Sequence, residues 1–513
     1  MTASKRHPMT WSTAAGLTAL VTAMVAILAG GATGAAGAPP GKTAACPDAG
    51  EIRDGKIPAA KRIWRAQLRM IENGPRIVAN PALAEWQDYL SRRFRKLGLD
   101  VDREGVQVND GWWDHREWSL KLVDDGQVVD VPVSAYRPYS GFTGPAGVEG
   151  ELADAGLGTQ AEFDAGEFNG KVALIEQPAI PLTRANFITP DTLVYDPDGE
   201  LAPSDPYNRA WTAIQAPQNG APGRARTAGA VAAIVAWDYS AEAATGQWIP
   251  FSQQPTSAAG VVPTLYVDRE TGAMLREKVA DGASVRLVLD GEVHPESGEL
   301  TDDIVATLPG MTDEVVIVNS HSDGISASQE NGAVGMLALA RYFSSLPKFC
   351  RSKTLVFALP VGHFRGGLGG DTARFIERNP DIIERAVGSL TLEHLGQMEW
   401  VDDESGFHPT GRREGGIHYT SPPLVDIDWN AILAEDWRFM QVTPTNGPHF
   451  GVGSPLKAAG VPNIAFIAGP HHMFSWGERI GDEYTQNIEQ TRKEELHLAV
   501  RGFARMVSAM DGL

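Results

Sequence analysis

The C-terminal half of the chain contains four short apolar runs, at residues 314–319, 353–359, 389–392 and 463–467. Between them, the spacing of apolar positions predicts helices over residues 332–343 and 371–378. Continuous apolar runs that alternate with helices are typical of strands buried on both faces of a parallel sheet. The pattern therefore predicts an α/β fold with a mostly parallel central sheet and helices on both of its faces.

Residues that can bind a metal ion or accept a proton follow each of these runs. They are His321 and Asp323, then His363, then Glu393 and His394, and finally His471 and His472. Ligands of parallel sheets gather beyond the carboxyl ends of the strands, so these side chains would converge in one cleft. A mixture of imidazole and carboxylate donors suits zinc or another divalent transition metal. The pattern favours a metallohydrolase.

The rest of the chain has two parts with different sequence patterns. Residues 56–99 carry two helical patterns, and residues 101–108 alternate between apolar and polar as a strand does. From 143 to 293, short β-like runs are separated by Gly, Pro and Asp, which predicts a β-rich domain of its own. Within it, the Pro-, Asn- and Asp-rich stretch 180–222 predicts an extended loop.

The first 38 residues have the pattern of a signal peptide. Lys5 and Arg6 precede an apolar stretch at about residues 14–29, and Ala36-Gly37-Ala38 can supply the cleavage site. No later segment is long and apolar enough to span a membrane. We expect a secreted, extracellular protein, with an uncleaved N-terminal anchor as the alternative.

Charge and cysteine content limit the partners and the compartment only in part. A formal net charge of −20 argues against nucleic acid or an anionic membrane as a partner, because both select basic patches. The two cysteines, Cys46 and Cys350, can pair in an oxidising compartment. Two free thiols, one exposed and one buried, are the alternative.

Several motifs, in their order and spacing, resemble those of the secreted family-28 zinc metallopeptidases that carry an inserted protease-associated (PA) domain. The matching segments are residues 95–101, His321-Ser322-Asp323, 354–370, 392–396 and 459–462, with 168–175 and 228–235 resembling the PA domain. The resemblance implies a zinc-exopeptidase fold in two parts, at residues 50–142 and 294–513, around a PA-like insert at 143–293.

The resemblance also implies a set of ligands. The family uses two zinc ions, a bridging carboxylate, a glutamate base and several terminal ligands. By position, His321 would bind the first zinc, Asp323 would orient that imidazole, and Glu393 would bind the same metal. His472, or its neighbour His471, would match the late histidine on the second metal.

The chain departs from the family at two motifs. Where the family has a bridging aspartate, residues 328–332 offer only Glu330, which could bridge, bind one metal or cap the following helix. The family's paired glutamates, a base and a ligand of the second metal, fall on Gly362-His363-Phe364. Phenylalanine cannot bind zinc, so His363 either replaces a ligand or acts as the general base.

These observations predict a secreted, zinc-dependent hydrolase of the aminopeptidase type, with one or two metal ions. It would cleave a peptide or small amide with a metal-activated water, and His363 or Glu330 would serve as base. The alternative is a catalytically impaired homologue that binds peptides or a partner protein. Because no histidine falls within residues 143–293, the insert is expected to border the cleft without supplying ligands.

Overall fold

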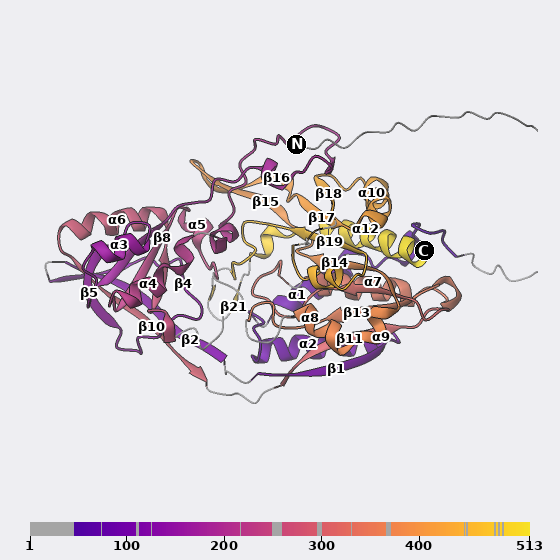
Figure 1. Ribbon diagram of the computed structural model, residues 1–513, viewed down its shortest axis with the longest axis horizontal. Helices are drawn as coiled ribbons and strands as arrows, with labels where there is room; N and C mark the ends of the chain where they lie inside the picture. Colours follow the sequence, from indigo (N-terminus) through magenta and orange to yellow (C-terminus); the bar gives the residue numbers. More distant parts are fainter. Residues whose placement is uncertain are drawn as a thin grey trace, which may run out of the picture. The chain divides into compact units, whose positions relative to one another are not determined.

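A nine-stranded mixed sheet is the larger of the two main sheets of the protein (Figure 1). The computed structural model describes residues 46–513 except 73, 109–111, 125, 216, 249–258, 295–299, 330, 366–370, 446, 448–449, 477–478, 481–482 and 485–486. The strand order is β1-β11-β13-β12-β14-β19-β17-β18-β7. The strands are β1 (Asp100–Gln107), β7 (Leu193–Tyr195), β11 (Leu300–Leu308), β12 (Val315–Asn319), β13 (Thr354–Leu359), β14 (Ala386–Glu393), β17 (Gly416–Thr420), β18 (Met440–Pro444) and β19 (Asn463–Ala468).

The four apolar runs of the sequence are the four central strands, and they are parallel. β13, β12, β14 and β19 lie next to one another in that order, so their carboxyl ends meet at one edge of the sheet. Antiparallel pairs occur on either side of them, where β11 joins β13 and β17 joins β19. The predicted α/β fold is confirmed, with the parallel order confined mainly to the centre.

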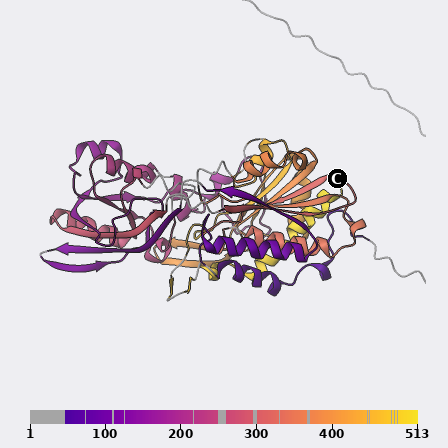
Figure 2. The same cartoon turned by 90° about the horizontal axis from the view of Figure 1, so that it is seen from below.

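Helices cover both faces of this sheet (Figures 1 and 2). Alternate residues of β12 divide between two cores: Val316 and Val318 pack with the larger helical layer, whereas Val315 and Ile317 pack with the smaller one. The larger layer contains α1 (Ala60–Ile71), α2 (Pro81–Lys96), α7 (Gly332–Ser344), α10 (Val425–Ala434) and α12 (Lys493–Asp511). The smaller layer contains α8 (Asp371–Arg378) and α11 (Ser454–Ala458), and α9 (Pro380–Glu384) follows α8.

A second sheet of eight strands has its own hydrophobic core. Its order is β3-β2-β10-β5-β6-β8-β9-β4. The strands are β2 (Trp112–Asp124), β3 (Gln127–Val131), β4 (Ala135–Tyr136), β5 (Val148–Asp154), β6 (Val172–Gln177), β8 (Ala232–Trp237), β9 (Thr264–Val267) and β10 (Ser284–His294). Its helices are α3 (Gln160–Ala165), α4 (Ala221–Thr227), α5 (Ala241–Ala244) and α6 (Arg269–Ala280).

This sheet begins before the boundary that the sequence indicated. β2, β3 and β4 precede Thr143, and β2 pairs with β10 from Trp112 to Val123. The sequence indicated a boundary at residue 143 because Gly, Pro and Asp become frequent there. β2 lies before that point, and its mixture of charged and apolar residues resembles that of β1, a strand of the other sheet. Hydrogen bonding across the sheet, which the sequence does not display, assigns β2 to β10.

The stretch expected to be an extended loop returns to the central sheet. It contains β7, which pairs with β18, and three 3₁₀ turns at Arg184–Phe187, Ala210–Gln215 and Pro217–Gly220. Its Arg209 donates to Glu414 at 3.2 Å and to Glu399 at 3.3 Å, and all three side chains are buried. The carboxylates of Glu399 and Glu414 offset the desolvation cost of burying Arg209, and these contacts hold the stretch against the central sheet.

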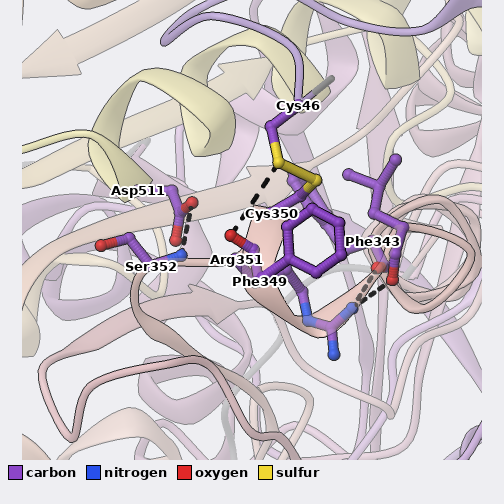
Figure 3. Close-up of a disulfide and its surroundings, with 8 residues drawn as sticks. Cys46, Phe343, Phe349, Cys350, Arg351, Ser352 and Asp511 are labelled. Carbon is purple, nitrogen blue, oxygen red and sulfur yellow. Dashed lines mark hydrogen bonds between the residues drawn. A yellow bond between two sulfur atoms is a disulfide. The ribbon is translucent and has the colours of Figure 1, made fainter. Parts of the chain in front are cut away.

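A disulfide joins Cys46 to Cys350, which decides the question that the sequence left open (Figure 3). The surrounding turn is held by Arg351, which donates to the carbonyls of Phe343 and Leu346, and by Asp511, which accepts from the Ser352 amide. The bridge spans a sequence separation of 304 residues, so it ties the start of the described chain to its core. Among the described residues, no helix is long and apolar enough to cross a membrane.

Candidate metal centre

His321 follows β12 and is fully buried. Its Nδ1 lies 2.6 Å from the main-chain carbonyl oxygen of Asp323. A nitrogen that donates to a carbonyl carries the proton, so the lone pair of the neutral ring lies on Nε2. This Nε2 atom is buried and has no hydrogen-bond partner among the residues that the structure describes.

Glu393 is the last residue of β14 and points toward the same space. Its Oε1 accepts a hydrogen bond from the Val452 amide at 2.9 Å. Its Oε2 is buried, lies 4.0 Å from His321 Nε2 and has no partner in the described part of the chain. Burial raises the pKa of Glu393, and the charges of His363 and His321 act in the opposite direction.

His363 lies in the loop after β13, and its ring centroid is 4.3 Å from that of His321. Its Nδ1 is 3.1 Å from Oδ2 of Asp371, the first residue of α8. Burial lowers the pKa of His363, but the hydrogen bond and charge of Asp371, together with Glu393 and Asp323, outweigh it and raise the pKa to about 9. An imidazole placed among three carboxylates is therefore a strong binder of a proton or a metal cation.

These three side chains form one group. One donor atom from each of His321, His363 and Glu393 lies within 4.8 Å of the others. Two donors about 2.0–2.2 Å from one zinc ion can be at most about 4.4 Å apart, so the 4.0 Å between His321 Nε2 and Glu393 Oε2 fits. Two imidazoles and one carboxylate form the ligand set of many catalytic zinc sites, and the unpartnered buried atoms have the chemistry to hold such an ion.

Asp323 supports two of these ligands in different ways. Its carbonyl oxygen contacts His321, as described above, while its carboxylate lies 3.8 Å from that ring. The carboxylate instead accepts the amides of Gly362 at 3.1 Å and Phe364 at 2.8 Å, on either side of His363. Asp323 therefore contacts His321 through its main chain, and its side chain holds the loop that carries His363.

The late histidines lie apart from this group. His472 Nε2 is 3.0 Å from Gln397 Oε1, and burial, followed by the charge of His471, holds the pKa of His472 well below its ordinary value. His471 packs against the rings of Tyr239 and Phe407, and its Nε2 lies 3.2 Å from the carbonyl oxygen of Ala243. Neither joins the three-residue group, and Glu330 lies outside the described residues.

Sequence reasoning assigned no site role to Asp371, and it placed His394 among the strand-end candidates without including it in the ligand set. Asp371 binds His363 across eight positions of sequence, and its only sequence signal is an acidic residue at a helix start. His394 has a φ of 59°, and its Nδ1 lies 2.5 Å from the Ala468 carbonyl oxygen. Burial lowers the pKa of His394 to about 3, so this imidazole is neutral. Its position after Glu393 was visible in the sequence, but its left-handed backbone was not.

An apolar cavity of about 550 Å³ adjoins the segments that carry the site. Of its lining residues, Met473 follows His472 in the sequence, and the carbonyl oxygen of Ala468 is hydrogen-bonded to His394. A third, Phe450, precedes Gly451 and Val452, which contact Glu393. Aromatic and aliphatic side chains form most of the lining, and seven of the lining residues come from the stretch 180–222. The principal lining residues are Ile180, Leu182, Phe187, Tyr207, Trp211, Ile417, Tyr419, Phe450, Ile467 and Met473.

The sequence matches no model of a protein family and no curated protein. Solved structures do resemble it. An aminopeptidase from Aneurinibacillus sp. strain AM-1 aligns over 88% of this chain and 94% of its own, with 18% identity and a TM-score of 0.56. A zinc aminopeptidase from Bacillus subtilis aligns over 88% and 95%, with 19% identity and a TM-score of 0.54.

The precursor of a family-28 peptidase from Shewanella amazonensis aligns over 88% of this chain and 96% of its own, with 16% identity and a TM-score of 0.61. The chain has the fold of these peptidases. At such identities the likeness concerns the fold, so the chemistry has to be argued from the side chains of this chain.

Proposed function

We propose that this protein is a zinc-dependent hydrolase of the aminopeptidase type, which cleaves a peptide or small amide. The observation that carries the proposal is the convergence of His321, His363 and Glu393, with buried His321 Nε2 and Glu393 Oε2 atoms that lack partners among the described residues. Burying such polar atoms without a partner costs several kcal/mol, on the order of 1–3 for each neutral group and more for a charged one. A bound cation would remove that cost.

In this proposal His321, His363 and Glu393 hold the ion, and Asp371 and Asp323 hold the two imidazoles in place. When bound, zinc lowers the pKa of water to about 7 and polarises a carbonyl. Because the Nδ1 of His363 is hydrogen-bonded to Asp371, we assign this histidine as a ligand, not as the base. Glu330 is then the carboxylate that the sequence offers for the proton transfer.

The apolar cavity would hold an apolar or aromatic side chain of the substrate. Burying such a group there contributes roughly 1.5–3 kcal/mol of binding free energy, which would orient the adjacent amide toward the ligand group. The leader at residues 1–38 would direct the protein out of the cell, and the Cys46–Cys350 disulfide supports an oxidising compartment.

One observation favours the competing function, a binding protein without catalysis. Phe364, which stands where the family has a carboxylate ligand, is fully buried and packs near Trp248 and Phe474. An apolar core residue therefore occupies the position at which the family has a carboxylate ligand of the second metal.

A panel of aminoacyl amides and short peptides separates the two functions. The purified mature protein should hydrolyse at least one member, lose that activity with a chelator and regain it with zinc, with the largest kcat/KM for substrates with an apolar N-terminal residue. Binding of peptides without turnover, in protein that contains stoichiometric zinc, would instead support the binding protein.

A further inference from the structure

The helical layer contains a second cavity, of about 570 Å³, between α1, α2 and α7. Both α1 and α2 pack on α7, and α7 in turn packs on β14, the strand that ends at Glu393 (Figure 1). The residues that line it belong to these three helices or lie next to them. They are Pro58, Arg62, Ile63, Arg65, Ala66, Tyr89, Arg93, Lys96, Leu97, Val334, Leu337, Ala338 and Arg341.

Five of these residues are cationic and none is acidic. Arg62, Arg65, Arg93, Lys96 and Arg341 have no ion pair with any carboxylate in the described ranges, although the chain as a whole carries a formal charge of −20. The guanidinium of Arg93 lies over the ring of Tyr89, 5.5 Å from its centroid. A concentration of uncompensated positive charge in an acidic protein is a local feature that whole-chain charge conceals.

The acidic residues of the same helices pair elsewhere. Glu72 and Glu85 lie 2.5 Å and 3.6 Å from the guanidinium of Arg69, and Asp88 lies 3.8 Å from that of Arg92. Neither arginine lines the cavity. Residues 1–45 contain no Asp or Glu, so that segment cannot supply a counter-charge.

The arginines of the cavity lining repel one another electrostatically. Burial, followed by the charges of Arg62 and Arg93, lowers the pKa of Arg341 below its ordinary value. Holding three guanidinium groups together costs electrostatic energy, which a bound anion would offset. A monoanionic carboxylate would compensate one of them, whereas a phosphate group brings up to two charges and several acceptor oxygens that match the guanidinium fork.

The floor of the cavity is apolar. Ile63, Val334 and Leu337 are buried, and Leu97 is half-buried. A small inorganic ion would leave this floor uncovered, while a hydrocarbon next to the phosphate would cover it at about 25 cal/mol per Å². The cationic rim and the apolar floor therefore call for two chemically different parts in one ligand.

We propose that the cavity between α1, α2 and α7 binds a phosphate monoester with an attached hydrocarbon part, with Arg62, Arg93 and Arg341 around the phosphate. The ligand can be a soluble phosphate ester or the headgroup of an anionic phospholipid, since both present the same chemistry. The site is independent of the metal centre and of the hydrolase function.

Calorimetric titration at low salt tests this with three probes: inorganic phosphate, decyl phosphate below its micelle concentration, and vesicles of phosphatidic acid in phosphatidylcholine. We expect decyl phosphate to bind at least tenfold more tightly than inorganic phosphate, because only it covers the apolar floor. Binding of decyl phosphate with no binding to vesicles identifies a soluble ester, and binding to vesicles identifies a lipid headgroup.

The variant R62Q/R341Q should weaken binding of the preferred probe tenfold or more, since each lost contact is a charge-assisted hydrogen bond. The matched control K61Q/R92Q removes the same net charge from exposed positions outside the lining and should change the Kd by less than twofold. Thermal unfolding verifies that both variants are folded. If both variants weakened binding equally, the effect would be due to net charge alone, and the proposed site would be wrong. Failure of all three probes to bind folded wild-type protein would also overturn the proposal.

Discussion

His321 Nε2 lies 4.0 Å from Glu393 Oε2, and both atoms are buried without a hydrogen-bond partner in the described part of the chain. The other polar atom of each side chain is engaged, His321 Nδ1 by the Asp323 carbonyl and Glu393 Oε1 by the Val452 amide. Each group is thus fixed in orientation with one donor atom presented to the other. Preorganised donors of this kind favour a cation between them, and His363 is the third member of the set.

Replacing His363 by alanine should remove metal and activity together. Loss of one ligand from a site with three protein donors weakens an open catalytic zinc site severely, so we expect a zinc content below about one tenth of wild type after dialysis. His363→Glu keeps a donor and should retain more metal than the alanine variant. Elemental analysis by mass spectrometry measures both. Full zinc content in His363→Ala would show that this residue is not a ligand.

Asp371→Asn should weaken zinc binding without removing any ligand. The carboxylate that orients His363 becomes a neutral amide, and changes of this kind cost about 10- to 100-fold in metal affinity. A competition titration with a fluorescent zinc chelator measures the Kd. The control Asp381→Asn alters an exposed acid of α9 and should leave the Kd unchanged. An unchanged Kd in Asp371→Asn would contradict the assigned role.

Glu330→Gln tests the proton acceptor. If Glu330 is the base, the variant should keep wild-type zinc content and KM while kcat falls by about 10² to 10⁴, the usual contribution of general acid–base catalysis. Steady-state kinetics on the best amide of the panel, with zinc analysis of the same preparation, gives the answer. Loss of zinc in this variant would make Glu330 a ligand and contradict its role as base.

Buried neutral histidines should make the protein sensitive to acid. Burial, followed by the charge of Arg209, lowers the pKa of His471 from its ordinary value near 6.5 to about 4. Below pH 6.5 the unfolded chain therefore binds a proton that the folded chain excludes. The free energy of unfolding falls as pH drops from 6.5 to 4, by up to about 3 kcal/mol from this residue.

Urea unfolding of chelator-treated protein between pH 4 and 8 measures this effect. In His471→Gln the slope of the free energy of unfolding against pH should be smaller over pH 4–6.5 than in wild type, whatever the change in absolute stability. His394 and His472 contribute with the same sign, so a residual slope is expected. An identical slope in the variant would show that His471 does not titrate as described.

The fold could be predicted because it is expressed locally in the sequence. Runs such as 314–319 and 463–467 are apolar on both faces, which is a property of central parallel strands, and β12 and β19 occupy these positions. The start of the second sheet at Trp112 was not predictable in this way. β2 is assigned by its pairing with β10, which lies about 170 residues further along the chain.

Some residues of the site were likewise predictable from the local sequence, whereas others were not. His321, His363 and Glu393 lie within one or a few residues of strand ends, so parallel topology alone brings them together. His472 also follows a strand, yet its ring contacts Gln397, because the turn between β19 and this histidine determines its direction. Asp371 and the cationic cavity depend on packing between distant segments, which periodicity and motif spacing do not encode.

Crystals of the mature protein grown with zinc, with diffraction data collected on both sides of the zinc absorption edge, would show whether His321, His363 and Glu393 hold a metal ion. We predict an anomalous difference peak, present only above the edge, bounded by His321 Nε2, the His363 ring and Glu393 Oε2. Zinc-replete crystals with no peak among these three side chains, or with a peak only elsewhere in the chain, would contradict the account.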